Sequence, residues 1–203
     1  MKKGGLVLIV ILGFIFLIGV GSCTFYTNAY NQMVSLDEGV SGAWAQVQNV
    51  YQRRLDLIPN LVETVKGYAA HEATVFSDIA EARSRVGGVV KISSDDLNDP
   101  VKMEEFQEAQ NSLSGALQRL LVVSENYPEL KADQNFLALQ DQLEGTENRI
   151  SVERSKFNER VTEYNTFIRS FPKNFIANMA GFQIKDKFIA DSAAQNAPSV
   201  SFN

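Results

Sequence analysis

The sequence predicts an all-α protein, an elongated antiparallel helical bundle of three to four helices that follows an N-terminal transmembrane helix. Residues 4–36 carry no charge, and the stretch from Leu6 to Val20 is almost purely apolar. Beyond it, apolar residues recur at steps of three and four, the spacing of amphipathic helices in a bundle or coiled coil. Strand signals are scarce, and 203 residues contain only five prolines. Together these patterns favour helices throughout.

The N-terminal apolar segment predicts a membrane anchor. From Gly5 to Phe25 it has 21 residues, which as a helix span roughly 30 Å, the thickness of one bilayer core. We expect a retained transmembrane helix, with two alternatives. Small residues before the only cysteine, Cys23, resemble a loose lipoprotein signal, which makes Cys23 a candidate for lipidation. A cleaved secretory peptide fits less well, because its apolar core is normally shorter.

The orientation follows from the distribution of basic residues. Lys2 and Lys3 precede the anchor, and no further basic residue occurs until Arg53. The positive-inside bias therefore predicts a cytoplasmic N-terminus and an extracytoplasmic bundle. A single cysteine excludes an internal disulfide, so cysteine usage does not identify the compartment.

The charge balance excludes some partners. The chain has 19 basic and 24 acidic residues, and without Lys2 and Lys3 the remainder carries a net charge near −7. An acidic domain of this kind is a poor match for nucleic acid or for an anionic lipid surface.

The first amphipathic helix is predicted from about Asn28 to Val86. Pro59 lies inside this stretch, and we expect a kink rather than a break, because nothing before it resembles a helix cap. Gly87 and Gly88 are expected to end the helix as a C-terminal cap. Its apolar stripe includes Met33, Val40, Trp44, Val47, Tyr51, Leu55, Ile58, Leu61, Val65, Tyr68, Phe76, Ile79 and Val86.

Two further helices are predicted after a loop over residues 89–98. Asp99 followed by Pro100 is a typical helix start, and this helix is expected to end near Asn126. Tyr127-Pro128 marks a turn, and Asp133 caps a last long helix that stops before Phe171-Pro172. The last helix carries the stripe Phe136, Leu139, Leu143, Ile150, Phe157, Val161, Tyr164 and Ile168.

The chain is thereby divided into three parts. Residues 1–27 form the anchor, residues 28–190 the bundle, and residues 191–203 a loosely ordered tail. Within the bundle, residues 173–189 are expected to hold a short helix or turn. The end of the tail, residues 198–202, is either a frayed terminus or a short extended peptide that docks on a neighbour.

Few residues suggest chemistry. His71 is the only histidine, and no second histidine follows four residues later as a zincin site requires. The acidic loop at residues 95–99 lacks the glycine and the glutamate of a calcium-binding EF-hand. We therefore predict no enzyme activity, no cofactor and no metal.

The candidate interaction residues lie along the two long helices. Arg154 falls where the apolar stripe of the last helix should continue, so if buried it needs a carboxylate partner, for which Asp56 and Glu63 are candidates. The alternative is a polar patch reserved for a partner or for the register of an assembly. The candidates are Trp44, Tyr51, Arg53, Arg54, Asp56, Pro59, Asn60, Glu63 and Arg154.

The sequence resembles the LemA family over nearly its whole length. The most specific block is Arg53-Arg54-Leu55-Asp56-Leu57-Ile58-Pro59-Asn60-Leu61. Residues 30–38, 65–72, 147–150 and 171–182 and the ending Pro198-Ser199-Val200-Ser201-Phe202 also match. The resemblance implies a bacterial, single-anchor membrane protein with a helical bundle and no settled biochemical activity. Family descriptions often place the bundle in the cytoplasm, opposite to the charge argument.

Two functions follow as hypotheses. The first is a non-enzymatic helical scaffold or adaptor, held by its anchor in the membrane, that forms a homo-oligomer or docks another membrane or envelope protein. The alternative is a module that binds an envelope lipid or peptide in a groove between the long helices. A large apolar cavity near residues 44–68 would favour the second, and a solidly packed core there would count against it.

Overall fold

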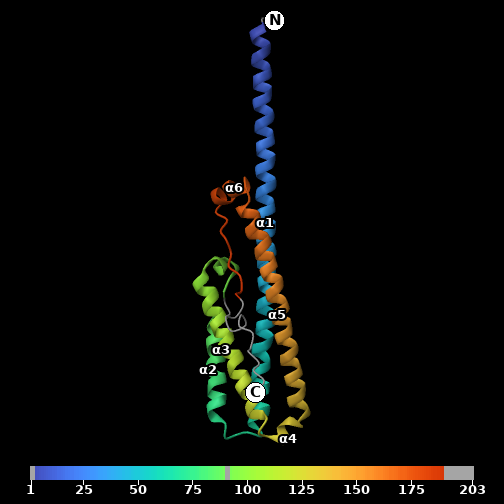
Figure 1. Ribbon diagram of the computed structural model, residues 1–203, viewed down its shortest axis with the longest axis vertical. Coiled ribbons are helices and arrows are strands. Elements are labelled where there is room, and N and C mark those ends of the chain that lie inside the picture. The colour runs from blue at the N-terminus through green and yellow to red at the C-terminus, as the bar shows by residue number, and fades with distance from the viewer. Residues whose placement is uncertain (1–2, 90–91, 190–203) are drawn as a thin grey trace, which may run out of the picture.

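One helix, α1 (Lys3–Lys66), runs through the whole length of the molecule (Figure 1). The computed structural model describes residues 3–89 and 92–189, so the predicted tail at 191–203 lies outside the described residues. With 64 residues, α1 is about 96 Å long. Its N-terminal part projects beyond the bundle with apolar side chains such as Leu12 and Phe16 exposed. Within the described residues, this is the one helix long and apolar enough to cross a membrane.

No break in α1 separates the anchor from the bundle. The helix also continues past Pro59 for a further seven residues to Lys66, so the prediction that this proline does not end the helix is confirmed. The anchor and the first bundle helix are therefore one rigid element.

The predicted continuation of this helix to Val86 is wrong. Residues 67–72 form a turn, after which α2 (Ala73–Val89) runs back along the bundle. Gly67 follows the last residue of α1, where an added Cβ would lie 3.3 Å from the Thr64 carbonyl oxygen. Gly87 and Gly88 lie inside the last turn of α2 rather than forming its cap. The reversal lets Ile79 and Val86 be buried within the bundle instead of extending away from it.

The starts of the next helices are confirmed. Asp99 accepts hydrogen bonds from the backbone of Val101 and Lys102 at the start of α3 (Pro100–Ser124). The predicted loop before it contains a 3₁₀ helix, η1 (Ser94–Asn98). After the short α4 (Pro128–Lys131), Asp133 accepts from the backbone N–H of Phe136 and caps α5 (Gln134–Arg169).

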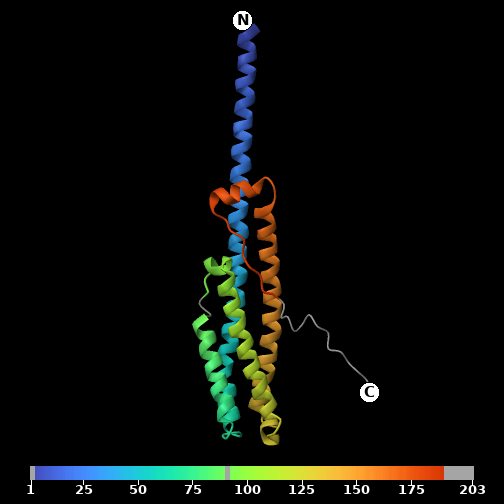
Figure 2. The same cartoon turned by 60° about the vertical axis from the view of Figure 1, so that its left-hand side comes forward.

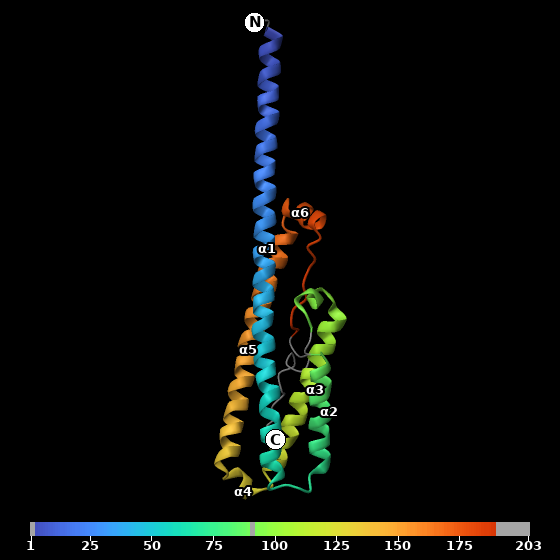
Figure 3. The ribbon, with the colours of Figure 1, turned by 180° about the vertical axis from the view of Figure 1, so that it is seen from behind.

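The helices form two close antiparallel pairs. α5 lies along α1 and α2 lies along α3, as the three views show (Figures 1, 2 and 3). The connection α4 lies at the end of the bundle away from the N-terminus (Figure 3). The described part of the chain thus confirms an all-α, elongated antiparallel bundle.

The C-terminal part of the bundle returns along α5. α6 (Lys173–Ala180) lies where α1 leaves the bundle (Figure 2), and Gly181 ends it with a positive φ of 81° that favours glycine. Residues 182–189 then run between α3 and α5 without regular secondary structure. The predicted short helix or turn at 173–189 is therefore a short helix followed by an extended segment, called here the strap (residues 182–189).

Candidate functional site

The apolar interior consists of two clusters stacked along the bundle. The first contains the buried residues from Ala29 to Tyr51 of α1 and lies toward the anchor. The second contains those from Leu55 to Val65 and lies toward the far end. The division between Tyr51 and Leu55 coincides with a buried arginine, Arg54, of which only 1% is exposed.

Trp44 occupies the centre of the first cluster. It is 2% exposed, and its ring lies 5.3 Å from Phe106, 5.4 Å from Phe157 and 5.9 Å from Phe188, centroid to centroid. Its indole N–H donates to the carbonyl oxygen of Ile92 at 3.0 Å. Since this partner satisfies its only polar atom, Trp44 is a core residue rather than an exposed interface anchor.

Arg54 connects three helices within a polar layer. Its guanidinium donates to Glu147 Oε1 at 2.8 Å and to Ser114 Oγ at 3.0 Å, and also to Gln110 Oε1. Gln110 is itself buried, whereas the side chain of Glu147 is 42% exposed. A buried charge needs such partners, and here they link α1 to α3 and α5.

Tyr51 closes the layer on the side of the first cluster. Its ring centroid lies 5.1 Å from the Arg54 guanidinium carbon. Burial raises the pKa of Tyr51 above its usual value near 10, an effect that the charges of Arg154 and Arg54 reduce. Tyr51 is therefore neutral at physiological pH and contributes packing rather than charge.

The structure places Arg154 differently from the sequence-based expectation. Arg154 is half-buried, with its guanidinium carbon 4.5 Å from the centroid of Phe188, and it donates to the carbonyl oxygen of Ile189 at 3.4 Å. The proposed partners Asp56 and Glu63 are exposed on α1. The fully buried arginine is Arg54, three residues after Tyr51 and four before Ile58. This spacing places Arg54 on the apolar stripe, and it is the signal that could have found it.

Four candidate residues of α1, Arg53, Asp56, Asn60 and Glu63, share one exposed face with Gln46 and Asn49, whereas Pro59 is half-buried beside it. They follow each other at alternating steps of three and four residues, and are called here the polar stripe. Gln52 beside it donates to Asp56 at 2.8 Å. No other described helix covers this face, because every member is exposed. The polar stripe consists of Gln46, Asn49, Arg53, Asp56, Asn60 and Glu63.

Two asparagines of α5 hold the strap. Asn165 donates to the carbonyl oxygen of Lys185 at 2.8 Å and accepts from its N–H at 3.0 Å. Asn158 makes the same pair of bonds with Phe188, at 3.0 and 2.9 Å. Asn158 and Asn165 are seven residues apart on a helix, a rise of about 10.5 Å. Lys185 and Phe188 are three residues apart in extended chain, about 10 Å, so the two distances match. The strap was not predicted, and the seven-residue spacing of these two asparagines is the sequence signal that could have indicated it.

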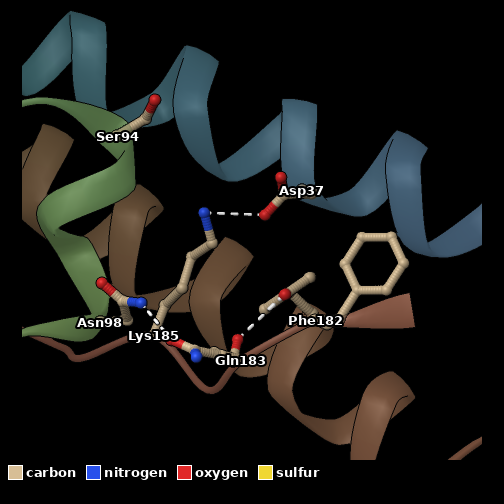
Figure 4. Close-up of a pocket in the computed structure, with 8 residues that line it drawn as sticks. Asp37, Ser94, Asn98, Phe182, Gln183 and Lys185 are labelled. Atoms are coloured by element: carbon tan, nitrogen blue, oxygen red, sulfur yellow. Dashed lines mark hydrogen bonds and ion pairs between the residues drawn. The ribbon is translucent and has the colours of Figure 1, made fainter. Parts of the chain in front are cut away.

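A polar pocket lies where the strap meets α1 (Figure 4). Lys185, whose side chain is 10% exposed, points across it to Asp37, with 2.7 Å between Nζ and Oδ1. Tyr164 donates its hydroxyl to the carbonyl oxygen of Gln183 at 2.9 Å. Burial, with a smaller contribution from Asp37, raises the pKa of Tyr164 to about 12. The pocket has a volume of about 200 Å³ and is crossed by this internal ion pair.

The interior near residues 44–68 is solidly packed. Trp44, Val47, Ile58, Leu61 and Val65 are all at most 2% exposed. A cleft of about 510 Å³ does lie between α1 and α2 beside Leu55, and it includes the polar residues Gln52 and Arg83. Among the described residues no three histidine, cysteine, aspartate or glutamate side chains form a metal site.

The chain is similar to one protein family and to several curated proteins. The model of the LemA family matches residues 43–202. Protein LemA of Metamycoplasma hominis is 26% identical over 182 residues, covering 87% of this chain and 78% of its own length. Magnetosome protein MamQ 1 of Paramagnetospirillum magneticum and magnetosome protein MamQ of Magnetospirillum gryphiswaldense are 25% and 24% identical over 191 residues. Each alignment covers 85% of this chain and 68% of the relative. None of these names is that of an enzyme.

Proposed function

The chain belongs to the LemA family, and from this premise we propose that it is a membrane-anchored, non-enzymatic scaffold that associates through the polar stripe of α1. Residues 1–27 would hold the protein in the bilayer and residues 28–190 would form the bundle. With Lys2 and Lys3 retained in the cytoplasm, the bundle stands on the extracytoplasmic side.

The observation that carries this proposal is the exposure of the polar stripe. Arg53, Asp56, Asn60 and Glu63 are exposed on one face of α1, and the opposite face of this part of the helix is buried in the bundle. The face carries both signs of charge within ten residues, which suits recognition by complementary charge. Alternating steps of three and four residues are also the spacing with which one helix meets another.

The packed interior favours a scaffold over the ligand-binding alternative. The first cluster is filled by aromatic rings, and the polar pocket at the strap is crossed by the ion pair of Asp37 and Lys185. The cleft beside Leu55 is open to solvent and partly polar. Neither offers a lipid tail the enclosed apolar groove that it needs.

The test is the mass of the full-length protein in mild detergent, measured by light scattering, beside a version that starts at Asn28. We expect a discrete homo-oligomer in both. The charge reversals Arg53→Glu and Glu63→Lys are each expected to weaken the homo-oligomer. If the two residues pair across copies, the double variant should recover part of the association.

The matched control is Arg160→Glu, an exposed charge of α5 whose side chain is 58% exposed and pairs with Glu163. This reversal should leave the mass unchanged. An oligomer only in the full-length form would assign association to the anchor. Monomers in both forms would contradict self-association, and cross-linking in native membranes would then test for a different partner protein at Arg53.

A further inference from the structure

α6 has an apolar face that no described part of the chain covers. Phe175 is 64% exposed and Met179 71%, and Phe171, just before the helix, is 80% exposed. On another face of α6, Ile176 and Ala177 are buried in the first cluster with Met33 of α1. α6 is therefore fixed to the bundle by one face while large apolar side chains project from the other.

α6 lies close to the end of the apolar segment of α1 (Figure 2). Ala29 and Met33 belong to the same buried cluster as Ile176, and the ring of Phe182 packs edge-on against Tyr30 at 5.8 Å. The apolar segment of α1 ends at Phe25, five residues before Tyr30, which is about 7.5 Å along the helix. The headgroup region on each side of a bilayer is roughly 5–7 Å thick. The views place α6 beside α1 at this end of the bundle (Figures 1 and 2).

The scarcity of charged residues around α6 also suits a position close to the end of the apolar segment of α1. Residues 26–36 of α1 carry no charge, and between Ser170 and Ile184 the only charged residue is Lys173. Tyr26 and Tyr30 stack at 6.3 Å on α1, and tyrosine is enriched where membrane proteins cross the headgroup region. Two segments far apart in the sequence thus supply an almost uncharged collar around the point where α1 leaves the apolar layer.

We propose that α6 lies in the surface of the bilayer that α1 crosses, with Phe171, Phe175 and Met179 inserted at the boundary between headgroups and lipid chains. The partner is a phospholipid surface of any headgroup, because insertion here is apolar and only Lys173 is available to attract anionic lipid. The inference rests on α1 spanning the membrane, and it adds a second membrane contact that fixes how the bundle stands.

The test uses the full-length protein in phosphatidylcholine vesicles. Single cysteines in a Cys23→Ser background carry a nitroxide label, and its collisions with oxygen and with a water-soluble nickel chelate report depth. The test positions are Phe175→Cys and Met179→Cys. Val122→Cys, 68% exposed on α3, is the control. Ile15→Cys reports whether the anchor spans the bilayer.

We expect labels at 175 and 179 to favour oxygen, as in lipid. The label at 122 should be the more accessible to nickel. Added anionic lipid and high salt should leave this order unchanged. Nickel access at 175 and 179 equal to that at 122, with the label at 15 in lipid, would overturn the inference alone. A label at 15 accessible to water would overturn both the inference and membrane anchoring.

A second copy of the chain, instead of lipid, is the other partner that would cover the apolar face of α6, and the same labels test for it. It would shield labels at 175 and 179 from oxygen and from nickel alike. That protection would fall when the protein is diluted into excess vesicles, whereas lipid insertion would not change. Shielding that depends on dilution therefore also overturns the proposal.

Discussion

At the scale of single residues, Arg54 determines how the interior is organised. Its charge lies between the two apolar clusters and is matched by Glu147, which is itself partly in water. The two partners therefore differ in what their removal leaves behind. Without Arg54, Glu147 can return to water, whereas without Glu147 the buried guanidinium keeps its charge and loses its anion.

This asymmetry predicts that Glu147→Ala destabilises the bundle by about 3 kcal/mol. Arg54→Met, which keeps much of the volume, should cost less, about 1–2 kcal/mol, because it leaves the Gln110 amide without its partner. In the double variant the cost of Glu147→Ala should largely disappear. Urea unfolding of all three variants checks this, and simply additive costs would show that the pair is not coupled.

A second residue prediction concerns alkaline pH. The pKa of Tyr164 rises to about 12, above its unfolded value near 10. The unfolded chain thus loses the tyrosine proton first, and the stabilisation, complete below pH 10, is lost as pH rises from 10 to 12. The melting temperature of Tyr164→Phe should fall less steeply over this range than that of the original protein. Identical slopes would contradict the assignment to Tyr164.

At the scale of elements, the sequence predicts most helices because their ends carry local chemistry. Asp99 and Asp133 are caps that act on their own neighbouring backbone, so no tertiary information is needed to find them. The break at residues 67–72 was missed because the apolar stripe continues across it with the same period. Gly67 was the only local signal, and the reversal is favoured by burial of α2 against α3, a contact between distant segments.

The candidate site was less predictable because it, too, depends on contacts between segments that are distant in the sequence. That Arg54 and not Arg154 is fully buried depends on which elements cover each position of α1 and of α5. The strap depends on Asn158 and Asn165 meeting backbone that follows them by 20 to 30 residues. Helical periodicity identifies a buried face, but it does not identify the element that covers it.

The two asparagines predict a local effect on the strap. Asn165→Leu removes both bonds to Lys185, so the backbone N–H of Lys185 should exchange with deuterium much faster, and that of Phe188 less so. Asn158→Leu should reverse this pattern. Glu159→Gln, an exposed neighbour on α5, should change neither. Uniformly faster exchange throughout α5 would instead indicate general destabilisation.

Pro59 gives a further prediction for α1. Pro59→Ala restores a backbone donor inside the helix, so we expect a straighter and more stable α1. Spin labels at the exposed positions 49 and 63, in a Cys23→Ser background, measure the distance across it. An unchanged distance would show that Pro59 does not bend the helix.

At the scale of the whole molecule, continuity of α1 from anchor to bundle favours a retained anchor over a processed one. We predict that protein extracted from membranes has the intact mass of about 22.5 kDa. Cleavage before Cys23 with lipid attachment would remove the spanning segment and give a lighter, lipid-bearing chain. Mass spectrometry of the membrane fraction distinguishes the two, and a mass corresponding to a start at Cys23 would contradict the prediction.

A single helix that carries an apolar segment at one end and the bundle at the other also acts as a lever. About 40 residues of α1 lie beyond the apolar segment, a reach of roughly 60 Å. Rocking the anchor by about 10° would sweep the α4 end through about 10 Å. A tilt of the anchor, caused by a change in bilayer thickness or by a neighbour pressing on it, is thereby magnified into displacement at the far tip.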